Sequence, residues 1–215
     1  MKGVHPIRDF NKFYELQKIL MNDDKIRECL LLLVMYNTNL RVSDALLIRW
    51  FDILTLKGRI KTEFIVSEKK TTKKKWIPIS DQLSIALQRY FDVFHPRVTD
   101  YIFRTHSRRV KKRGNQPWSR VYVYSFLKKY AKKVGIEGRI GAHTPRKTWG
   151  YHAYQSGIDI YEIMRILNHS SVRTTEVYIG LDEDKIRETY NKLADKNSRA
   201  TGLFLEMSIN ESQKK

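Results

Sequence analysis

The chain has 215 residues, of which 41 are Lys or Arg and 23 are Asp or Glu, so its formal net charge is +18 and its isoelectric point lies near 9.9. This excess of positive charge predicts a polyanionic partner and favours nucleic acid over an anionic membrane or a ribosome. A single cysteine excludes a disulfide scaffold and a cysteine-rich zinc site, and the absence of a long apolar run or a signal-peptide core predicts a soluble protein of the cytoplasm.

The first half of the chain is expected to be helical before it turns to β-structure. Helical spacing of apolar residues predicts helices over 9–21 and 24–36, followed by a short helix for which Ser43 is a plausible cap. Between Arg59 and Ile79, two segments of alternating residues flank the lysine-rich EKKTTKKK, which predicts a β-hairpin with a basic tip. An amphipathic stripe then predicts a helix over 81–94.

The second half is predicted to be helical apart from an extended segment that leads into a basic loop. Ser119 is expected to cap the next helix, which Gly135 ends. Thr144 is expected to cap the following helix, with Pro145 at its first position. Two short helices lead up to Tyr178, and an amphipathic helix follows it. The pattern as a whole predicts one mostly helical α+β domain with a small antiparallel sheet.

Four basic side chains and a tyrosine stand out from this helical background. Arg41 borders an apolar helix, and His143 and Arg146 flank a predicted helix start. His169 precedes Tyr178 by nine positions. Arginine grips phosphate oxygens with its planar fork, and a helix N-terminus adds partial positive charge. A phenol with a pKa of about 10 is a poor nucleophile unless a base and nearby cations activate it. These residues therefore indicate an anion held beside a reactive tyrosine.

The order of the motifs resembles the catalytic domain of the tyrosine recombinases, the phage integrase family. The segment TNLRVSDALLIRWFDI resembles the family's first motif, in which an acidic residue follows an arginine after three positions, here Arg41 and Asp44. HTPR resembles the second motif, and LNHSSVRTTEVY resembles the third, with its histidine and tyrosine. The sequence departs from the family pattern at Asn168, where glycine is usual, at Pro145 and at Lys147.

The resemblance runs from about Asp9 to Tyr190 and implies the family's domain organisation. Residues 1–190 would form the catalytic domain, and the tail 191–215 would be exchanged with a neighbouring protomer. The apolar stretch GLFLEMSI in this tail is a candidate for that contact. The family's N-terminal core-binding domain is expected to be absent, and the chain is similar in size to the short fimbrial-type invertases.

The resemblance also implies strand cleavage and rejoining with no cofactor and no metal. Tyr178 would attack the scissile phosphate, forming a 3′-phosphotyrosyl link and a free 5′-hydroxyl. Arg41 and Arg146 would bind the non-bridging oxygens and stabilise the transition state. His143 would act as acid and base near the tyrosine proton, because its pKa suits transfer in both directions. His169 would hydrogen-bond the phosphate.

Further residues are assigned from the hairpin and the basic loop. The family's hairpin lysine lies about eight residues before a proline that ends the second strand, so Pro78 implies that Lys70 protonates the leaving 5′-oxygen. Asp44 would orient its neighbours. The other basic residues of the hairpin and loop are predicted to contact the DNA backbone, with a solvated surface charge as the alternative for each: Lys69, Lys73, Lys74, Lys75, Arg108, Arg109, Lys111, Lys112 and Arg113.

Each of these residues has a simpler interpretation when it is considered alone. Arg41 could be the salt-bridge partner of Asp44, His169 could be a cation favoured by a helix C-terminus, and Tyr178 could be a core aromatic. For the whole chain, the alternatives are a DNA-binding regulator that keeps the fold, a type IB topoisomerase-like enzyme and an RNA-binding protein. The motif order favours a site-specific recombinase. The resemblance implies that it works on double-stranded DNA as a homo-tetramer, and an accessory DNA-binding protein is a candidate further partner. Such a protein would be nucleoid-associated or phage-encoded.

Overall fold

The computed structural model describes residues 3–69, 73–105, 114–196 and 202. Its first two helices are α1 (Phe10–Asn22) and α2 (Ile26–Thr38), close to the predicted ranges. The Asp9 carboxylate accepts a hydrogen bond from the Asn11 amide and so caps α1. Helix α2 starts two residues later than predicted because Asp24 has a positive φ of 54°, which breaks the helical path before it. Most of α2 is buried, which places it at the centre of the fold.

Two short helices and the predicted hairpin follow. The helices are α3 (Val42–Ala45) and α4 (Trp50–Ile53), and the strands are β1 (Glu63–Ser67) and β2 (Lys74–Pro78). The strands pair antiparallel, with Glu63 opposite Pro78 and Ser67 opposite Lys74. The prediction that Ser43 caps a helix is wrong: Ser43 lies inside α3, and its hydroxyl donates to the Asp44 carboxylate at 3.4 Å. The cap position belongs to Arg41, which makes no side-chain capping bond.

The rest of the chain consists of helices. They are α5 (Asp81–Phe94), α7 (Arg120–Lys133), α8 (Thr144–Gln155), α9 (Ile160–Leu167), α10 (Val172–Ile179) and α11 (Leu181–Lys196). Ser119 caps α7, as predicted. The prediction for α8 is wrong by one residue, because His143 holds the cap position and Thr144 is already helical. The Thr144 hydroxyl instead accepts from the Gly141 amide and donates to the His5 carbonyl oxygen, which ties down the N-terminal segment.

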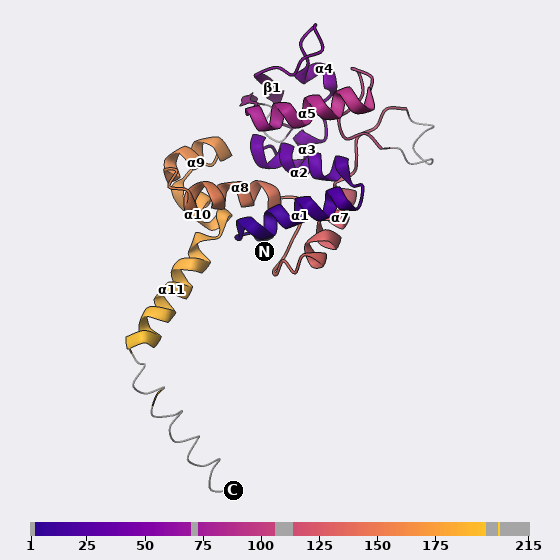
Figure 1. Cartoon of the computed structure of the whole chain (residues 1–215). Coiled ribbons are helices and arrows are strands. Elements are labelled where there is room, and N and C mark those ends of the chain that lie inside the picture. The colour runs from indigo at the N-terminus through magenta and orange to yellow at the C-terminus, as the bar shows by residue number, and fades with distance from the viewer. Residues whose placement is uncertain (1–2, 70–72, 106–113, 197–201, 203–215) are drawn as a thin grey trace, which may run out of the picture.

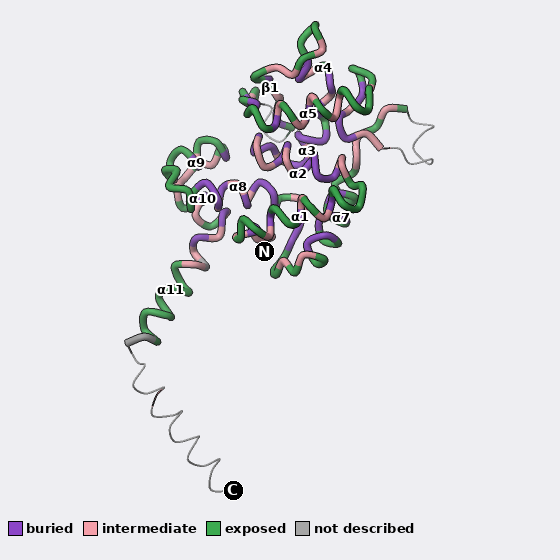
Figure 2. The backbone as a smooth tube through the Cα atoms, in the orientation of Figure 1, coloured by how far each residue is buried: buried purple, intermediate pink, exposed green. Residues whose placement is uncertain are grey.

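The apolar residues form two cores that α8 connects. The larger core joins α1, α2, α5, α7 and the hairpin, and the smaller one joins α8, α9, α10 and the start of α11. Figure 2 shows the buried positions gathered along α2 and α8 between these parts. Gly150 in α8 lets α10 pack closely, because a Cβ atom at this position would lie 2.7 Å from Ile179 Cγ2. This close contact fixes the end of α10, where Tyr178 lies.

The last helix departs from the body of the protein. Figure 1 shows α11 extending away from the other helices, directly after α10 ends at Gly180.

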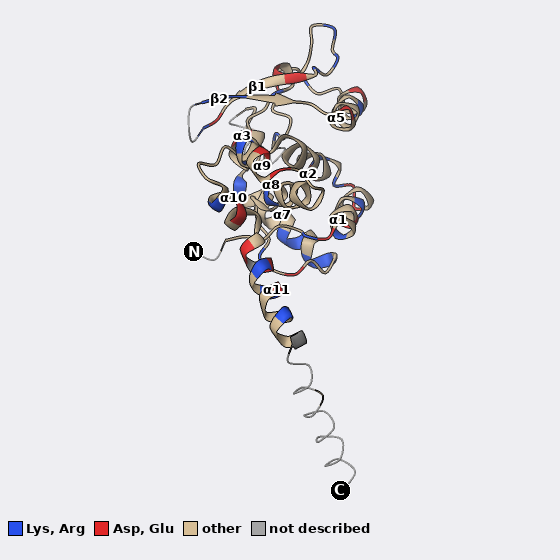
Figure 3. Cartoon of the chain, turned by 90° about the vertical axis from the view of Figure 1, so that its left-hand side faces the viewer, with Lys and Arg blue, Asp and Glu red and all other residues tan. Residues whose placement is uncertain are grey.

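None of the helices in the described ranges is both long and apolar enough to cross a membrane. Figure 3 shows Lys and Arg on β2, α7, α10 and α11. The predicted α+β class, mostly helical with one small antiparallel sheet, is confirmed.

Candidate active site

Arg146 is the most deeply buried cation of the site. It lies in the first turn of α8, only 2% of it is exposed, and its Nη2 donates to the Leu167 carbonyl oxygen at 2.7 Å. Its Nη1 is also buried and has no hydrogen-bond partner among the described residues. An unpartnered N–H on a buried guanidinium is costly. Arg146 is therefore arranged to receive an oxygen of a bound anion.

Arg41 lies at the N-terminus of α3, and its side chain is 19% exposed. Its Nη1 is 2.7 Å from Oε1 of Glu68, a residue that follows β1 and is almost fully buried. The alternative that Arg41 pairs with Asp44 is wrong. The Asp44 carboxylate instead accepts the backbone N–H of Lys69 at 3.1 Å, which anchors the hairpin to α3.

Two basic side chains donate hydrogen bonds to backbone carbonyl oxygens at the end of α9. Lys75 on β2 donates its Nζ to the Ile166 carbonyl oxygen at 2.9 Å, and Arg146 donates to the next carbonyl, that of Leu167. Asn168 then ends the helix with a positive φ of 54°. Asparagine is one of the few residues other than glycine that adopt this conformation readily. The departure from the family's glycine at Asn168 is therefore compatible with the same turn.

Tyr178 projects from α10 toward the third-motif histidine. Its ring lies 4.8 Å from the His169 ring at an angle of 74°, and the Lys147 Nζ lies 4.7 Å from its centroid. Burial raises the pKa of the Tyr178 phenol. The charges of Arg146 and Arg41, and the contact of the Arg146 guanidinium with the phenol, offset only part of this effect. Without DNA, the phenol is therefore protonated at neutral pH.

The two histidines of the site have lowered pKa values. Burial, reinforced by Arg146 and Arg41, lowers the pKa of His169 to about 4. The same causes, in the same order, lower the pKa of His143. His169 is therefore neutral at physiological pH, which argues against the interpretation that it is a cation at the end of α9. A neutral His143 is in the form that a proton acceptor requires.

Glu68 was not predicted as a site residue, although the strand pattern contains a signal for it. Phe64 and Val66 face inward on β1. Because side chains alternate along a strand, Glu68 continues the same face. Because Glu68 is the first residue of the lysine-rich segment EKKTTKKK, that pattern assigns it to the exposed hairpin tip, and its inward orientation was missed.

The hairpin lysines lie in different environments. Lys69, Lys73 and Lys74 are exposed, as expected of residues that contact a DNA backbone. Lys75 is half-buried, and burial together with Arg146 lowers its pKa to about 8. The other predicted basic residues lie outside the described ranges: Lys70, Arg108, Arg109, Lys111, Lys112 and Arg113.

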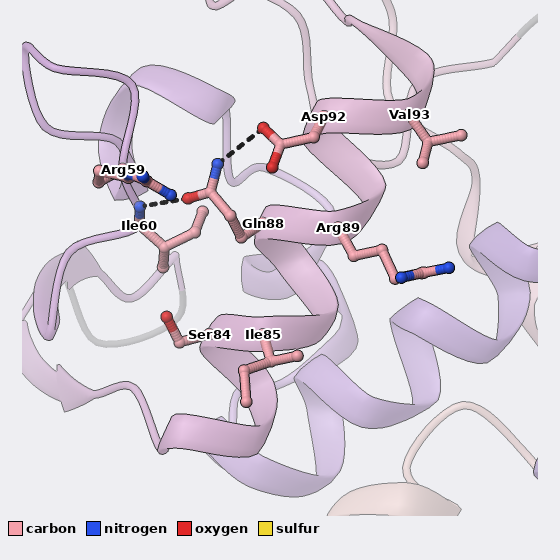
Figure 4. A pocket seen from close by; sticks show the side chains of 8 residues that line it. All are labelled: Arg59, Ile60, Ser84, Ile85, Gln88, Arg89, Asp92 and Val93. Atoms are coloured by element: carbon pink, nitrogen blue, oxygen red, sulfur yellow. Dashed lines mark hydrogen bonds between the residues drawn. The ribbon is translucent and has the colours of Figure 1, made fainter.

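The structure thus brings Arg41, His143, Arg146, His169 and Tyr178 together, and their catalytic roles stay predictions. A separate groove of about 580 Å³ runs beside α5 (Figure 4) and is lined by none of these residues. Within the ranges that the structure describes, no group of His, Cys, Asp and Glu side chains is placed to hold a metal ion.

Comparisons with known proteins agree with this arrangement. The sequence profile described as "Phage integrase family" matches residues 9–185. The chain is 37% identical over 190 residues to "Probable integrase/recombinase YoeC" of Bacillus subtilis, and the alignment covers 88% of this chain and 97% of that protein. It is 31% identical to "Tyrosine recombinase XerA" of Pyrococcus horikoshii, and this alignment covers 83% of this chain and 59% of that protein.

Solved structures share the fold at lower sequence identity. The crystal structure of XerA recombinase superposes with a TM-score of 0.64 at 23% identity, over 89% of this chain and 64% of that one. The XerH site-specific recombinase bound to its palindromic difH substrate gives a TM-score of 0.64 at 16% identity, over 87% of this chain and 53% of that one. Fold and sequence both define the catalytic domain of a tyrosine recombinase. The chain belongs to the phage integrase family.

Proposed function

We propose that this chain cleaves and rejoins double-stranded DNA at specific sites through a 3′-phosphotyrosyl intermediate. The observation that carries the proposal is the buried Arg146, whose Nη1 has no hydrogen-bond partner among the described residues. Tyr178 and Arg41 both lie close enough to Arg146 to influence its pKa through their charges. A phosphate diester fits this site because each arginine presents N–H groups to one of its oxygens. The likeness in fold to XerH, a site-specific recombinase whose structure contains its palindromic difH substrate, supports a site-specific reaction for this chain.

The proposed step conserves atoms and charge. The Tyr178 oxygen attacks phosphorus, a P–O bond to the tyrosine forms, and the P–O5′ bond breaks. His143 accepts the phenol proton, and Lys70 gives a proton to the leaving 5′-oxygen. Arg41 and Arg146 bind the non-bridging oxygens, and His169 donates a hydrogen bond to one of them. Rejoining reverses these transfers, so the energy of the phosphodiester bond is kept and no ATP is consumed.

The assembly that we propose is a homo-tetramer on two DNA sites, in which the outer part of α11 and the tail 191–215 reach a neighbouring protomer. Helix α11 supports this proposal because it extends away from the body (Figure 1) and exposes Ile186, Tyr190 and Leu193. These residues follow at helical spacing and form an apolar stripe that a partner surface would cover. An accessory protein is a further proposed partner, because it would help to hold the DNA.

Covalent trapping tests the proposed function. The protein is incubated with sheared DNA from its source and denatured in detergent, and the attached DNA is sequenced. We expect adducts at a repeated sequence, with the protein on the 3′ end of the cut strand. DNA binding without any adduct would instead favour a regulator that keeps the fold, and adducts without sequence preference would favour a topoisomerase-like enzyme.

Binding to DNA is expected to weaken steeply with salt. Each neutralised phosphate changes the logarithm of affinity by about −0.9 per tenfold rise in salt, so a contact with about five phosphates costs roughly 500-fold between 50 and 200 mM. Fluorescence anisotropy with a labelled duplex measures this slope. Lys74→Met, which removes an exposed hairpin cation, should reduce the slope by about 0.9. A flat response in the unchanged protein would contradict backbone contacts.

The proton donor to the 5′-oxygen can be identified by changing the leaving group. Lys70→Met is expected to slow cleavage by about 10²–10⁴-fold, the usual contribution of a general acid. A substrate with sulfur at the 5′-bridging position should restore the rate, because a thiolate leaves without a proton. Lys75→Met removes the contact to Ile166 and should slow cleavage by roughly tenfold, with no rescue by sulfur.

Lys75 is the rival donor because its pKa of about 8 allows it to lose a proton near neutral pH. Rescue by sulfur in Lys75→Met, and not in Lys70→Met, would transfer the role to Lys75. Single-turnover cleavage of matched oxygen and sulfur substrates measures both variants.

A further inference from the structure

Glu68 is a buried carboxylate in direct contact with the first-motif arginine. Its Oε1 lies 2.7 Å from Arg41 Nη1, and only 1% of its side chain is exposed. The backbone N–H of Glu68 donates to the Lys73 carbonyl oxygen at 3.0 Å, so the hairpin fixes where the carboxylate lies. The Asn168 side-chain amide lies 3.5 Å from the other oxygen, Oε2.

The surroundings of Glu68 explain how a carboxylate is tolerated there. A buried carboxylate requires close cations and hydrogen bonds, because burial alone favours its neutral form. Arg41 contacts it directly. The pKa values of Lys75 and Arg146 are lowered by burial, and both residues lie near enough to Glu68 for its negative charge to offset part of that lowering. Glu68 therefore belongs to the cation cluster that a scissile phosphate would enter.

The exposure of the two partners indicates which side of the pair remains open. The Arg41 side chain is 19% exposed, whereas that of Glu68 is 1% exposed. A phosphate can thus reach the guanidinium from its solvent side without displacing the carboxylate. Arginine has five N–H donors in a fixed fork, so a contact at Nη1 leaves others for the phosphate.

We propose that Glu68 is a positioning residue for DNA cleavage, which holds the Arg41 guanidinium through Nη1 so that its remaining N–H groups face the scissile phosphate. The weaker contact to Asn168 brings the turn before His169 to the same carboxylate. Glu68 thereby connects the hairpin with the first and third motifs. This proposal rests on the proposed recombinase function, since its readout is cleavage.

The test compares Glu68→Gln with Glu63→Gln in single-turnover cleavage and in DNA binding. Glu63 is an exposed glutamate on β1 and serves as the matched control. Glu68→Gln should slow cleavage by about 10–100-fold, because the amide holds the guanidinium less firmly than a carboxylate does. Its DNA affinity should change by less than about twofold. Glu63→Gln should match the unchanged protein.

A double-mutant cycle separates positioning from a general structural effect. If Glu68 acts through Arg41, Glu68→Gln should cost less than about twofold in an Arg41→Lys background. An equal loss in both backgrounds would overturn the proposal. A faster Glu68→Gln enzyme would also overturn it, because Glu68 would then compete with the phosphate for Arg41.

Thermal unfolding and a second variant guard against a folding defect. Glu68→Asp keeps the charge and shortens the side chain, so a folded Glu68→Asp protein should also cleave slowly, and full activity in it would contradict the positioning role. The unchanged protein is assayed in parallel. If it forms no covalent adduct, the proposed function fails; if it forms one and the folded variants match it, only the role of Glu68 fails.

Discussion

Replacing Tyr178 by phenylalanine is expected to abolish covalent capture of DNA while leaving the fold and DNA binding intact. The change removes the hydroxyl that would attack phosphorus, and the loss of a nucleophile lowers the rate by at least about 10³-fold. The aromatic ring remains, so its contacts with His169 and with the Lys147 Nζ are kept. Denaturing gel electrophoresis of end-labelled DNA measures the adduct.

The matched control for this variant is Tyr161→Phe. Tyr161 is exposed on α9, outside the constellation around Tyr178. It should form adduct at the unchanged rate. Adduct formation by Tyr178→Phe at a comparable rate would show that another side chain is the nucleophile, and loss in both variants would point to a defect in folding or DNA binding.

Replacing Arg146 by lysine is expected to reduce cleavage by about 10²–10³-fold, the usual loss for a donor that stabilises transition-state charge. The guanidinium uses Nη2 for the Leu167 carbonyl oxygen and keeps Nη1 for an anion. A lysine ammonium is one compact group and cannot span both positions as the planar fork does. Cleavage should therefore suffer more than binding, in which other basic residues take part.

Stability should also fall in Arg146→Lys, because the contact to the Leu167 carbonyl is buried. The expected loss in the free energy of unfolding is about 1–3 kcal/mol, measured by urea denaturation. Arg89→Lys is the control, since Arg89 is exposed on α5 beside the separate groove in Figure 4. Near-normal cleavage by a folded Arg146→Lys protein would show that the phosphate does not need the fork.

The sequence predicted the elements with long-range periodicity better than the local details of their ends. Helix α5 begins and ends where its apolar stripe does, and the hairpin strands match their alternation. The cap of α8 was misplaced because the hydroxyl of Thr144 binds the carbonyl of His5, which is distant in sequence. A side chain with several partners available cannot be assigned to one of them from local sequence alone.

The residues of the candidate site were predicted from motif order, but their ion pairs and pKa shifts could not be predicted in this way. The tyrosine, the two histidines and the two arginines could be named because each falls at a characteristic spacing. The partner of Arg41 could not, since Asp44 is nearer in sequence but Glu68 is the residue that folding brings to it. The lowered pKa of Lys75 likewise depends on burial and on Arg146, which comes from a distant helix.

The crowding of cations around Tyr178 has a consequence for the stability of the protein. Arg41, Arg146 and Lys75 outnumber the carboxylates of Glu68 and Asp44 in a partly buried site, and this excess of positive charge opposes folding when no anion is bound. A ligand that binds only the folded state raises its stability by mass action. We therefore expect bound DNA to raise the unfolding temperature of the protein, so that molecules without DNA are the first to unfold on heating.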